Sequence, residues 1–188
     1  MGAGRIGRVE AIYAKLAHTI YHNQKARTVS YLMKEMKPYL PTDEEFRQAF
    51  AVARVSQAKL ARYYLDALQR KQDKENDKPE LVPNDDTSQV NLEHVIPLTC
   101  RKDHWPDLER DVAEVLYGRL GNMALLNAKK NSMIGAHSFD EKKETLAASP
   151  FSFTNMITKK TSWGAQEVAE RQQQLAKLAV KTWPLRVD

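Results

Sequence analysis

The spacing of apolar residues predicts helices over most of the first seventy residues. At the start of the chain, apolar side chains recur at steps of mostly three or four residues, at Ile6, Val9, Ile12, Tyr13, Leu16 and Ile20. This spacing predicts a helix with one apolar face. A second helix is predicted over 29–39, a third over 42–53 where Thr42 and Glu45 form a capping box, and a fourth from about Ser56.

The second half of the chain predicts two short strands among further helices. Strands are expected over 90–95 and 119–126, separated by a helix over 107–116 and followed by a short helix over 128–134. Helices over 142–148 and 162–181 complete the pattern, with Ser162 as the expected cap of the last one. The fold class is therefore mainly α with a small two-strand unit, of the α+β type.

Charge divides the chain into three parts. Residues 1–71 carry a net charge of +7, residues 72–88 carry −4 and residues 89–188 carry +2. The middle part contains almost nothing to bury and predicts an exposed, flexible acidic linker. We therefore expect a helical N-terminal unit over 1–71, a linker over 72–88, and a second unit with C-terminal helices over 89–188.

Composition excludes several classes of protein. No apolar run is long enough to cross a membrane and the start lacks the pattern of a signal peptide, so an intracellular, cytoplasmic protein is expected. Cys100 is the only cysteine, which excludes an intramolecular disulfide and a cysteine-rich zinc site. The net charge of +5 favours a polyanionic partner.

Two motifs carry the candidate chemistry. The pair Glu93-His94 lies in the segment Asn91–Pro97, and the segment Leu120–Asn131 follows after the predicted helix. At matching offsets these segments resemble the two halves of an HNH, or ββα-metal, nuclease site, with His94, Asn122 and Asn131 at its three signature positions. Asn127 and Lys130 stand where that family has zinc-binding cysteines, so no structural zinc is expected.

Further segments narrow the resemblance to one group of enzymes. The chain is similar to the C-terminal HNH domain of GmrSD-type, modification-dependent restriction enzymes, in Phe139–Lys142, in Ser162-Trp163 with Glu167 and Arg171, and in Thr182–Pro184. This resemblance implies a bacterial DNA endonuclease that acts in antiviral (anti-phage) defence. It also implies an N-terminal NTPase and modification-sensing domain as partner, so we expect the effector end of a longer protein or a stand-alone relative.

The resemblance implies a role for each motif residue. His94 is expected to take a proton from the attacking water, and Asn122 to brace the loop behind it. Asn131, with Glu93 as a second candidate ligand, is expected to hold a divalent metal, Mg²⁺ or alternatively Mn²⁺. One base with one metal suits nicking of one strand at a time.

Each of these residues also has a simpler interpretation. His94 would then be a satisfied core histidine, Asn122 a turn residue after Gly121, and Asn131 a surface or capping residue. Glu93 can share a metal with His94 only if the chain bends, because neighbours on a strand point to opposite faces. His137, in a loop of small residues, is the competing candidate.

Basic residues near the motifs are candidate DNA contacts. Lys129, Lys130 and Lys142 follow the second motif, and Arg54, Arg62 and Arg70 recur at eight-residue steps along the N-terminal helices. The arginines fit a phosphate track or, alternatively, an ordinary solvated helix surface. Two other functions stay open: a non-catalytic DNA-binding module, and a nuclease directed at RNA.

Overall fold

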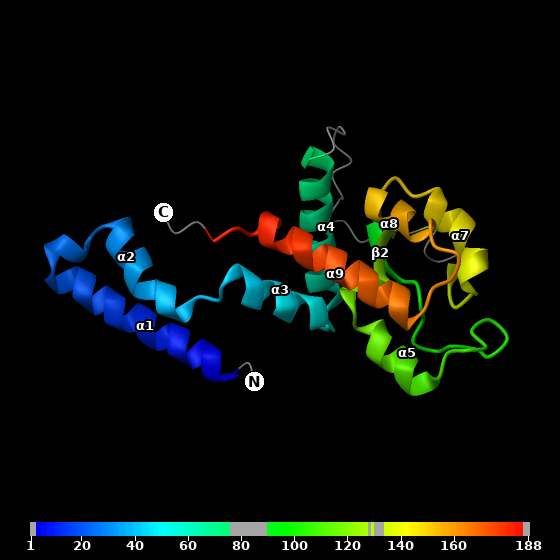
Figure 1. Ribbon diagram of the computed structural model, residues 1–188, viewed down its shortest axis with the longest axis horizontal. Coiled ribbons are helices and arrows are strands. Elements are labelled where there is room, and N and C mark those ends of the chain that lie inside the picture. Colours follow the sequence, from blue (N-terminus) through cyan, green and yellow to red (C-terminus); the bar gives the residue numbers. More distant parts are fainter. Residues whose placement is uncertain (1–2, 76–89, 128, 130–133, 186–188) are drawn as a thin grey trace. The chain divides into compact units, whose positions relative to one another are not determined.

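The chain folds as two compact units. The computed structural model describes residues 3–75, 90–127, 129 and 134–185 (Figure 1). One unit consists of the residues up to Phe46 with those from Pro184, and the other is Arg47–Trp183. The described residues are mostly helical and contain a two-stranded antiparallel sheet, which confirms the predicted fold class.

The first unit is a small helical assembly. Its elements are α1 (Ala3–His22), the 3-10 turn Gln24–Ala26, α2 (Val29–Met36) and the 3-10 turn Lys37–Tyr39. Arg27 donates hydrogen bonds to the carbonyls of Ile20 and Tyr21, two of the carbonyl groups that the last turn of α1 leaves without a partner in the helix. The predicted capping box is present: the Glu45 amide donates to Thr42 Oγ1 at 3.2 Å, and Glu45 Oε2 accepts from the Thr42 amide at 2.8 Å.

The sheet lies in the second unit and consists of β1 (Val90–His94) and β2 (Met123–Asn127). Their register pairs Val90 with Asn127 and His94 with Met123. All but the last residue of β2 are buried. Val95 and Ile96, directly after β1, are fully buried in the main core, which also includes Trp105, Leu116, Ala124, Leu126, Phe139, Leu146 and Trp163. The end of β1 is therefore fixed by packing on its apolar neighbours.

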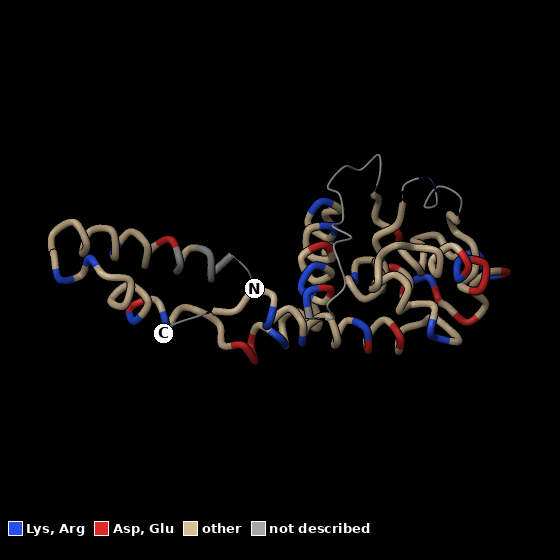
Figure 2. The backbone as a smooth tube through the Cα atoms, turned by 90° about the horizontal axis from the view of Figure 1, so that it is seen from above, with Lys and Arg blue, Asp and Glu red and all other residues tan. Residues whose placement is uncertain are grey.

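Helices precede, separate and follow the two strands along the chain of the second unit. They are α3 (Asp43–Val52, which starts in the first unit), α4 (Ala58–Glu75), α5 (Arg110–Tyr117), α7 (Phe139–Ala147), α8 (Ser152–Ile157) and α9 (Ala165–Thr182). Helix α4 contacts β1, β2, α8 and α9 (Figure 1). Along α4, Lys and Arg positions are interspersed with acidic ones (Figure 2).

Two buried glutamines join these helices to the rest of the unit. Gln69 of α4 accepts from the Phe153 amide and donates to Ser152 Oγ of α8. Gln172 of α9 accepts from the Gly121 amide at 2.6 Å and donates to the Phe50 carbonyl at 2.8 Å. Because buried amides are costly to leave unpaired, these bonds fix the positions of α4 and α9.

Several element boundaries differ from the prediction, and three of them lie near the motifs. The start of the predicted second strand is a 3-10 turn, Leu120–Asn122, before β2 begins. Helix α7 begins at Phe139 rather than at 142, because Ser138 and Glu141 form a capping box. Helix α9 begins at Ala165 after Gly164, so the predicted cap at Ser162 is wrong.

The three-part division at 1–71, 72–88 and 89–188 stays a prediction. Most of the acidic segment 72–88 lies outside the described residues. Residues 58–75 belong to the same compact unit as the sheet. Among the helices described, none is both long and apolar enough to cross a membrane.

Candidate active site

His94 is the last residue of β1 and lies half-buried at the wall of a pocket of about 520 Å³. Its ring stacks on Tyr117, with ring centroids 3.8 Å apart and planes 10° from parallel. The pocket is also lined by Leu92 and Met123 of the two strands and by Arg54 and Gly118. The imidazole therefore has a fixed orientation beside an open space large enough for a substrate group.

The environment of His94 keeps its ring neutral. Burial lowers the pKa of His94 to about 4, and the positive charge of Lys142 contributes in the same direction. At neutral pH the ring therefore holds a free lone pair that can accept a proton. Burial also makes the ring a weaker base than a free histidine, until a negative charge approaches it.

Arg54 brings a positive charge to the same pocket. Its exposed side chain donates to the Glu114 carbonyl at 2.9 Å, and its backbone forms an isolated bridge with Arg119. The next residue, Val55, donates to the Gly118 carbonyl at 2.7 Å. These bonds fasten the segment before α4 to the end of α5 and hold Arg54 at the wall of the pocket that His94 also lines.

Asn122 is fully buried and holds the loop that follows His94. Its Oδ1 accepts from the Ile96 amide at 2.8 Å, and its Nδ2 donates to the Ile96 carbonyl at 2.9 Å. Its own carbonyl accepts from the Val95 amide at 2.9 Å. Trp163 Nε1 donates to the same Oδ1 at 3.3 Å. Asn122 thus fixes the two residues after His94 through both its backbone and its side chain.

The turn that carries Asn122 is itself held by α9. Nη1 of buried Arg171 lies 3.1, 2.8 and 2.7 Å from the carbonyl oxygens of Leu120, Gly121 and Met123. A Cβ at Gly121 would collide with the Val168 carbonyl, so only glycine allows α9 to pack this closely. The Gly-Asn pair therefore serves close packing as well as the turn.

Glu93 points to the opposite face of β1 from His94. Its carboxylate Oε1 lies 2.6 Å from Nζ of Lys142, which is fully buried on α7. The same ammonium donates to the His94 carbonyl at 3.1 Å. Burial raises the pKa of Glu93, and the ion pair with Lys142 acts against that rise. The structure therefore places Lys142 inside the protein, as the partner of Glu93.

The other predicted site residues occupy several environments. Lys129 is exposed, Arg70 is exposed and pairs with Asp66, and Arg62 is buried on α4. Asn131 and Lys130 lie outside the described residues. The DNA contacts predicted for these side chains stay predictions.

The competing histidine lies in a different cluster. His137 stacks with His104 at 5.9 Å, and His104 Nδ1 lies 2.9 Å from Glu141 Oε2. Neither residue lines the pocket of His94.

The described residues do not by themselves fit a metal ion. Among them, no group of three or more His, Cys, Asp or Glu side chains is arranged to hold one. Glu93 is the predicted ligand that the structure describes, and its carboxylate is already bound to an ammonium group.

These features define a mainly helical domain whose small sheet presents a neutral, oriented histidine to a pocket. The family model described as "GmrSD restriction endonucleases, C-terminal domain" matches residues 40–178. The chain therefore belongs to this family of restriction endonuclease domains, and the resemblance inferred from its motifs is confirmed. A search of curated proteins found no match.

Several contacts of the site were not predicted from the sequence. The Tyr117 stack, the Trp163 bond and the Lys142–Glu93 pair join residues far apart in the chain. For Lys142 a signal was present: Phe139, Lys142 and Leu146 share the buried face of α7 at helical spacing. A charged residue on an apolar stripe indicates a buried partner rather than a surface contact.

Proposed function

We propose that this chain is a metal-dependent DNA endonuclease, the effector domain of a bacterial anti-phage restriction system, with His94 as general base. One observation carries the proposal: a neutral, stacked imidazole faces an open pocket, and the loop behind it is fixed by Asn122. Family membership supports DNA as the substrate.

The chemistry is hydrolysis of a phosphodiester bond. The water oxygen bonds to phosphorus, the bond from phosphorus to the leaving sugar oxygen breaks, and the water proton passes to His94. The leaving oxygen takes a proton from solvent. Arrival of the anionic DNA phosphate raises the proton affinity of the buried ring at the moment when the base is needed.

The chain offers exposed cations for the DNA backbone. Arg54 lines the pocket of His94, and Arg70 and Lys129 are exposed elsewhere on the second unit. We propose these three as phosphate contacts. Arg62 and Lys142 are buried, so a phosphate contact from either would require its side chain to leave its present packing.

Metal dependence is a separate part of the proposal. The family implies a divalent cation, and Asn131 with Glu93 would offer the hard oxygen ligands that Mg²⁺ or Mn²⁺ prefers. Glu93 would have to exchange the Lys142 ammonium for that cation. EDTA should stop cleavage and Mg²⁺ should restore it. Chelation should leave the Tm nearly unchanged, because no zinc knuckle is expected.

The test is a nicking assay on supercoiled plasmid with a matched histidine control. His94→Ala should lower the cleavage rate by about 10²- to 10⁴-fold, the usual contribution of a general base. His137→Ala should leave the rate unchanged, because His137 lies outside the pocket. If only His137→Ala lost activity, His137 would be the general base instead. If both variants kept full activity, neither histidine would be the base.

Two further readouts separate the alternative functions. A matched RNA substrate distinguishes a DNA enzyme from an RNA-directed nuclease, and binding without cleavage by the wild type would indicate a DNA-binding module. Appearance of open circles before linear DNA would support nicking of one strand at a time.

A further inference from the structure

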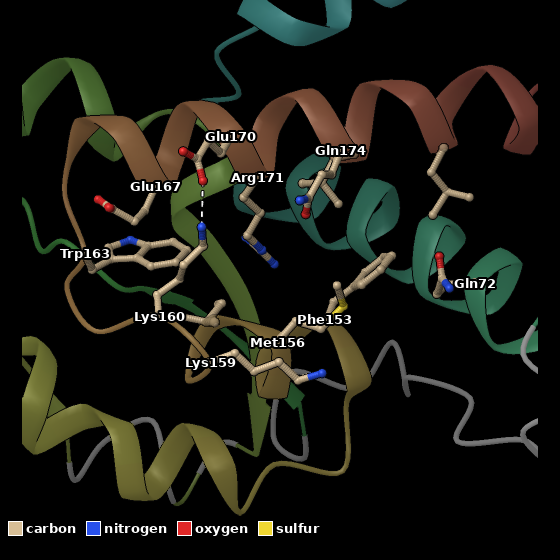
Figure 3. Close-up of a pocket in the computed structure, with 13 residues that line it drawn as sticks. Gln72, Phe153, Met156, Lys159, Lys160, Trp163, Glu167, Glu170, Arg171 and Gln174 are labelled. Atoms are coloured by element: carbon tan, nitrogen blue, oxygen red, sulfur yellow. Dashed lines mark hydrogen bonds and ion pairs between the residues drawn. The ribbon is translucent and has the colours of Figure 1, made fainter.

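A second pocket is lined by Trp163 and Arg171, which contact the Asn122 turn. It has a volume of about 380 Å³ and is formed by α8, α9 and the segment between them, with one residue from α4 (Figure 3). Phe153, Ile157, Trp163, Leu175 and Leu178 give it buried apolar walls. Lys159, Met156 and Gln174 are exposed and form its rim. A pocket of this size and lining can enclose a small organic molecule.

Arg171 places an incompletely paired charge at this pocket. The side chain is 8% exposed, and Figure 3 shows its guanidinium directed from α9 into the space between α9 and α8. Nη1 meets three backbone carbonyls, but Nη2 is buried and has no acceptor within the part of the chain that the structure describes. Burial lowers the pKa of Arg171 to about 10, so the group stays charged at neutral pH. A buried donor of this kind is costly unless an acceptor reaches it.

The charges of the residues around the pocket are compatible with an anionic ligand. Lys160 at the pocket wall pairs with Glu170 at 2.6 Å, so these two charges offset one another. Glu167 accepts from the Gly164 amide at 2.9 Å, and in Figure 3 its carboxylate points away from Arg171. With Glu167 counted, the lining carries a net charge of +1, from Lys159, Lys160 and Arg171 against Glu167 and Glu170.

We propose that this pocket binds a small organic monocarboxylate with an apolar body. Because Nη2 is buried, the side chains beside it must shift for the carboxylate to accept a charge-assisted hydrogen bond from Arg171. The body then lies against Phe153 and Trp163. Neutral amides lack the charge that Arg171 selects, and free phosphate lacks the apolar body. The binding does not depend on nuclease activity, so it stands or fails separately from the proposed function.

The pocket is also connected to the candidate active site. Trp163 donates to Asn122, and Arg171 holds the carbonyls on either side of Asn122. A ligand that contacts both side chains therefore stabilises the turn that fixes the loop behind His94. Binding should accordingly raise the Tm of the protein.

The experiment is calorimetric titration of the full chain with 4-phenylbutyrate, 4-phenylbutyramide and inorganic phosphate. For a carboxylate of this size we expect a Kd on the order of 1 mM or tighter. The amide should bind at least about tenfold more weakly, because its carbonyl can still accept a hydrogen bond but lacks the negative charge that attracts the guanidinium. Phosphate should give no saturable binding.

Variants at the rim test the location without disturbing the buried arginine. Gln174→Trp should block the pocket, and Gln173→Trp, an exposed neighbour of the same type outside the lining, is the matched control. Lys159→Glu should weaken binding, whereas Lys177→Glu on the outer face of α9 should not. Equal affinity for carboxylate and amide, equal binding by the two tryptophan variants, or no binding of 4-phenylbutyrate would each overturn the proposal.

Discussion

Two buried cations, Lys142 of α7 and Arg171 of α9, hold the candidate active site in different ways. Lys142 meets a carboxylate, Glu93, at 2.6 Å and also donates to the His94 carbonyl. Arg171 meets three backbone carbonyls on Nη1, and no carboxylate is placed against it among the described residues. One charge is neutralised within the fold, and the other is only solvated by backbone dipoles.

The two kinds of partner suit the two cations to different roles. A matched pair resists change, because removing one partner leaves the other as an unpaired buried charge. A cation held by dipoles keeps its full charge and can still attract an anion. Lys142 is therefore suited to fix the strand end at His94, and Arg171 to fix the Asn122 turn while it also offers a donor to a ligand.

The largest expected effect is loss of the Lys142 charge. Lys142→Met should destabilise the protein by about 3–5 kcal/mol, because it leaves the Glu93 carboxylate buried without its partner. The free energy of unfolding is measured by denaturant titration. The double variant Glu93→Leu with Lys142→Met should recover much of this loss, since an apolar pair of similar size has no charge to desolvate. A double variant as unstable as the single one would show that Lys142 acts by packing alone.

Removal of the Arg171 charge should cost less and respond differently to a second substitution. Arg171→Met leaves three carbonyl oxygens without their donor and should destabilise the protein by about 2–3 kcal/mol. Arg171→Lys keeps one donor group and should recover part of that loss. A larger effect than that of Lys142→Met would reverse the comparison.

The sequence predicted the elements better than it predicted these two cations. Apolar spacing and the Thr42 capping box depend on neighbours in the chain, so the helices and β1 could be placed from the sequence. Family motifs singled out His94 and Asn122, which the structure brings together around one loop. The partners of Lys142 and Arg171 lie about fifty residues away, so local patterns could not identify them.

The apolar stripes of α7 and α9 nevertheless contained a usable signal. Lys142 lies between Phe139 and Leu146, and Arg171 lies between Val168 and Leu175, at spacings that share one helix face. Both cations were therefore on faces that had to be buried. Whether such a residue meets a carboxylate or a set of carbonyls depends on tertiary packing, which the spacing alone does not encode.

The low pKa of His94, to which Lys142 contributes, predicts how the stability of the protein depends on pH. The pKa of His94 is about 4 in the folded protein against 6.5 for the ordinary side chain. The unfolded chain therefore binds an extra proton between these values, and the contribution of His94 to stability falls as the pH drops from about 6.5 to about 4. We expect a loss of about 2 kcal/mol in wild type relative to His94→Asn, measured as the difference between their unfolding free energies at each pH.

Lys142 contributes to this low pKa, and Arg171 is not among its causes. In NMR titrations, Lys142→Met should therefore raise the pKa of His94, and Arg171→Met should leave it unchanged. A His94 pKa near 6.5 in the wild type would contradict the burial of the ring.

The smallest expected effect is the loss of one hydrogen bond, from Trp163 to Asn122, in the turn that Arg171 also holds. Trp163→Phe removes the donor to Asn122, and Trp105→Phe removes a similar bond, 3.2 Å long, to the His137 carbonyl. Both tryptophans are 6% exposed, so each substitution should cost about 1 kcal/mol of stability. Only Trp163→Phe loosens the turn behind His94, and a weakening of about 1 kcal/mol there corresponds to a roughly fivefold slower cleavage step. Equal cleavage rates in the two variants would show that the α9 side of the turn supports the fold without positioning the base.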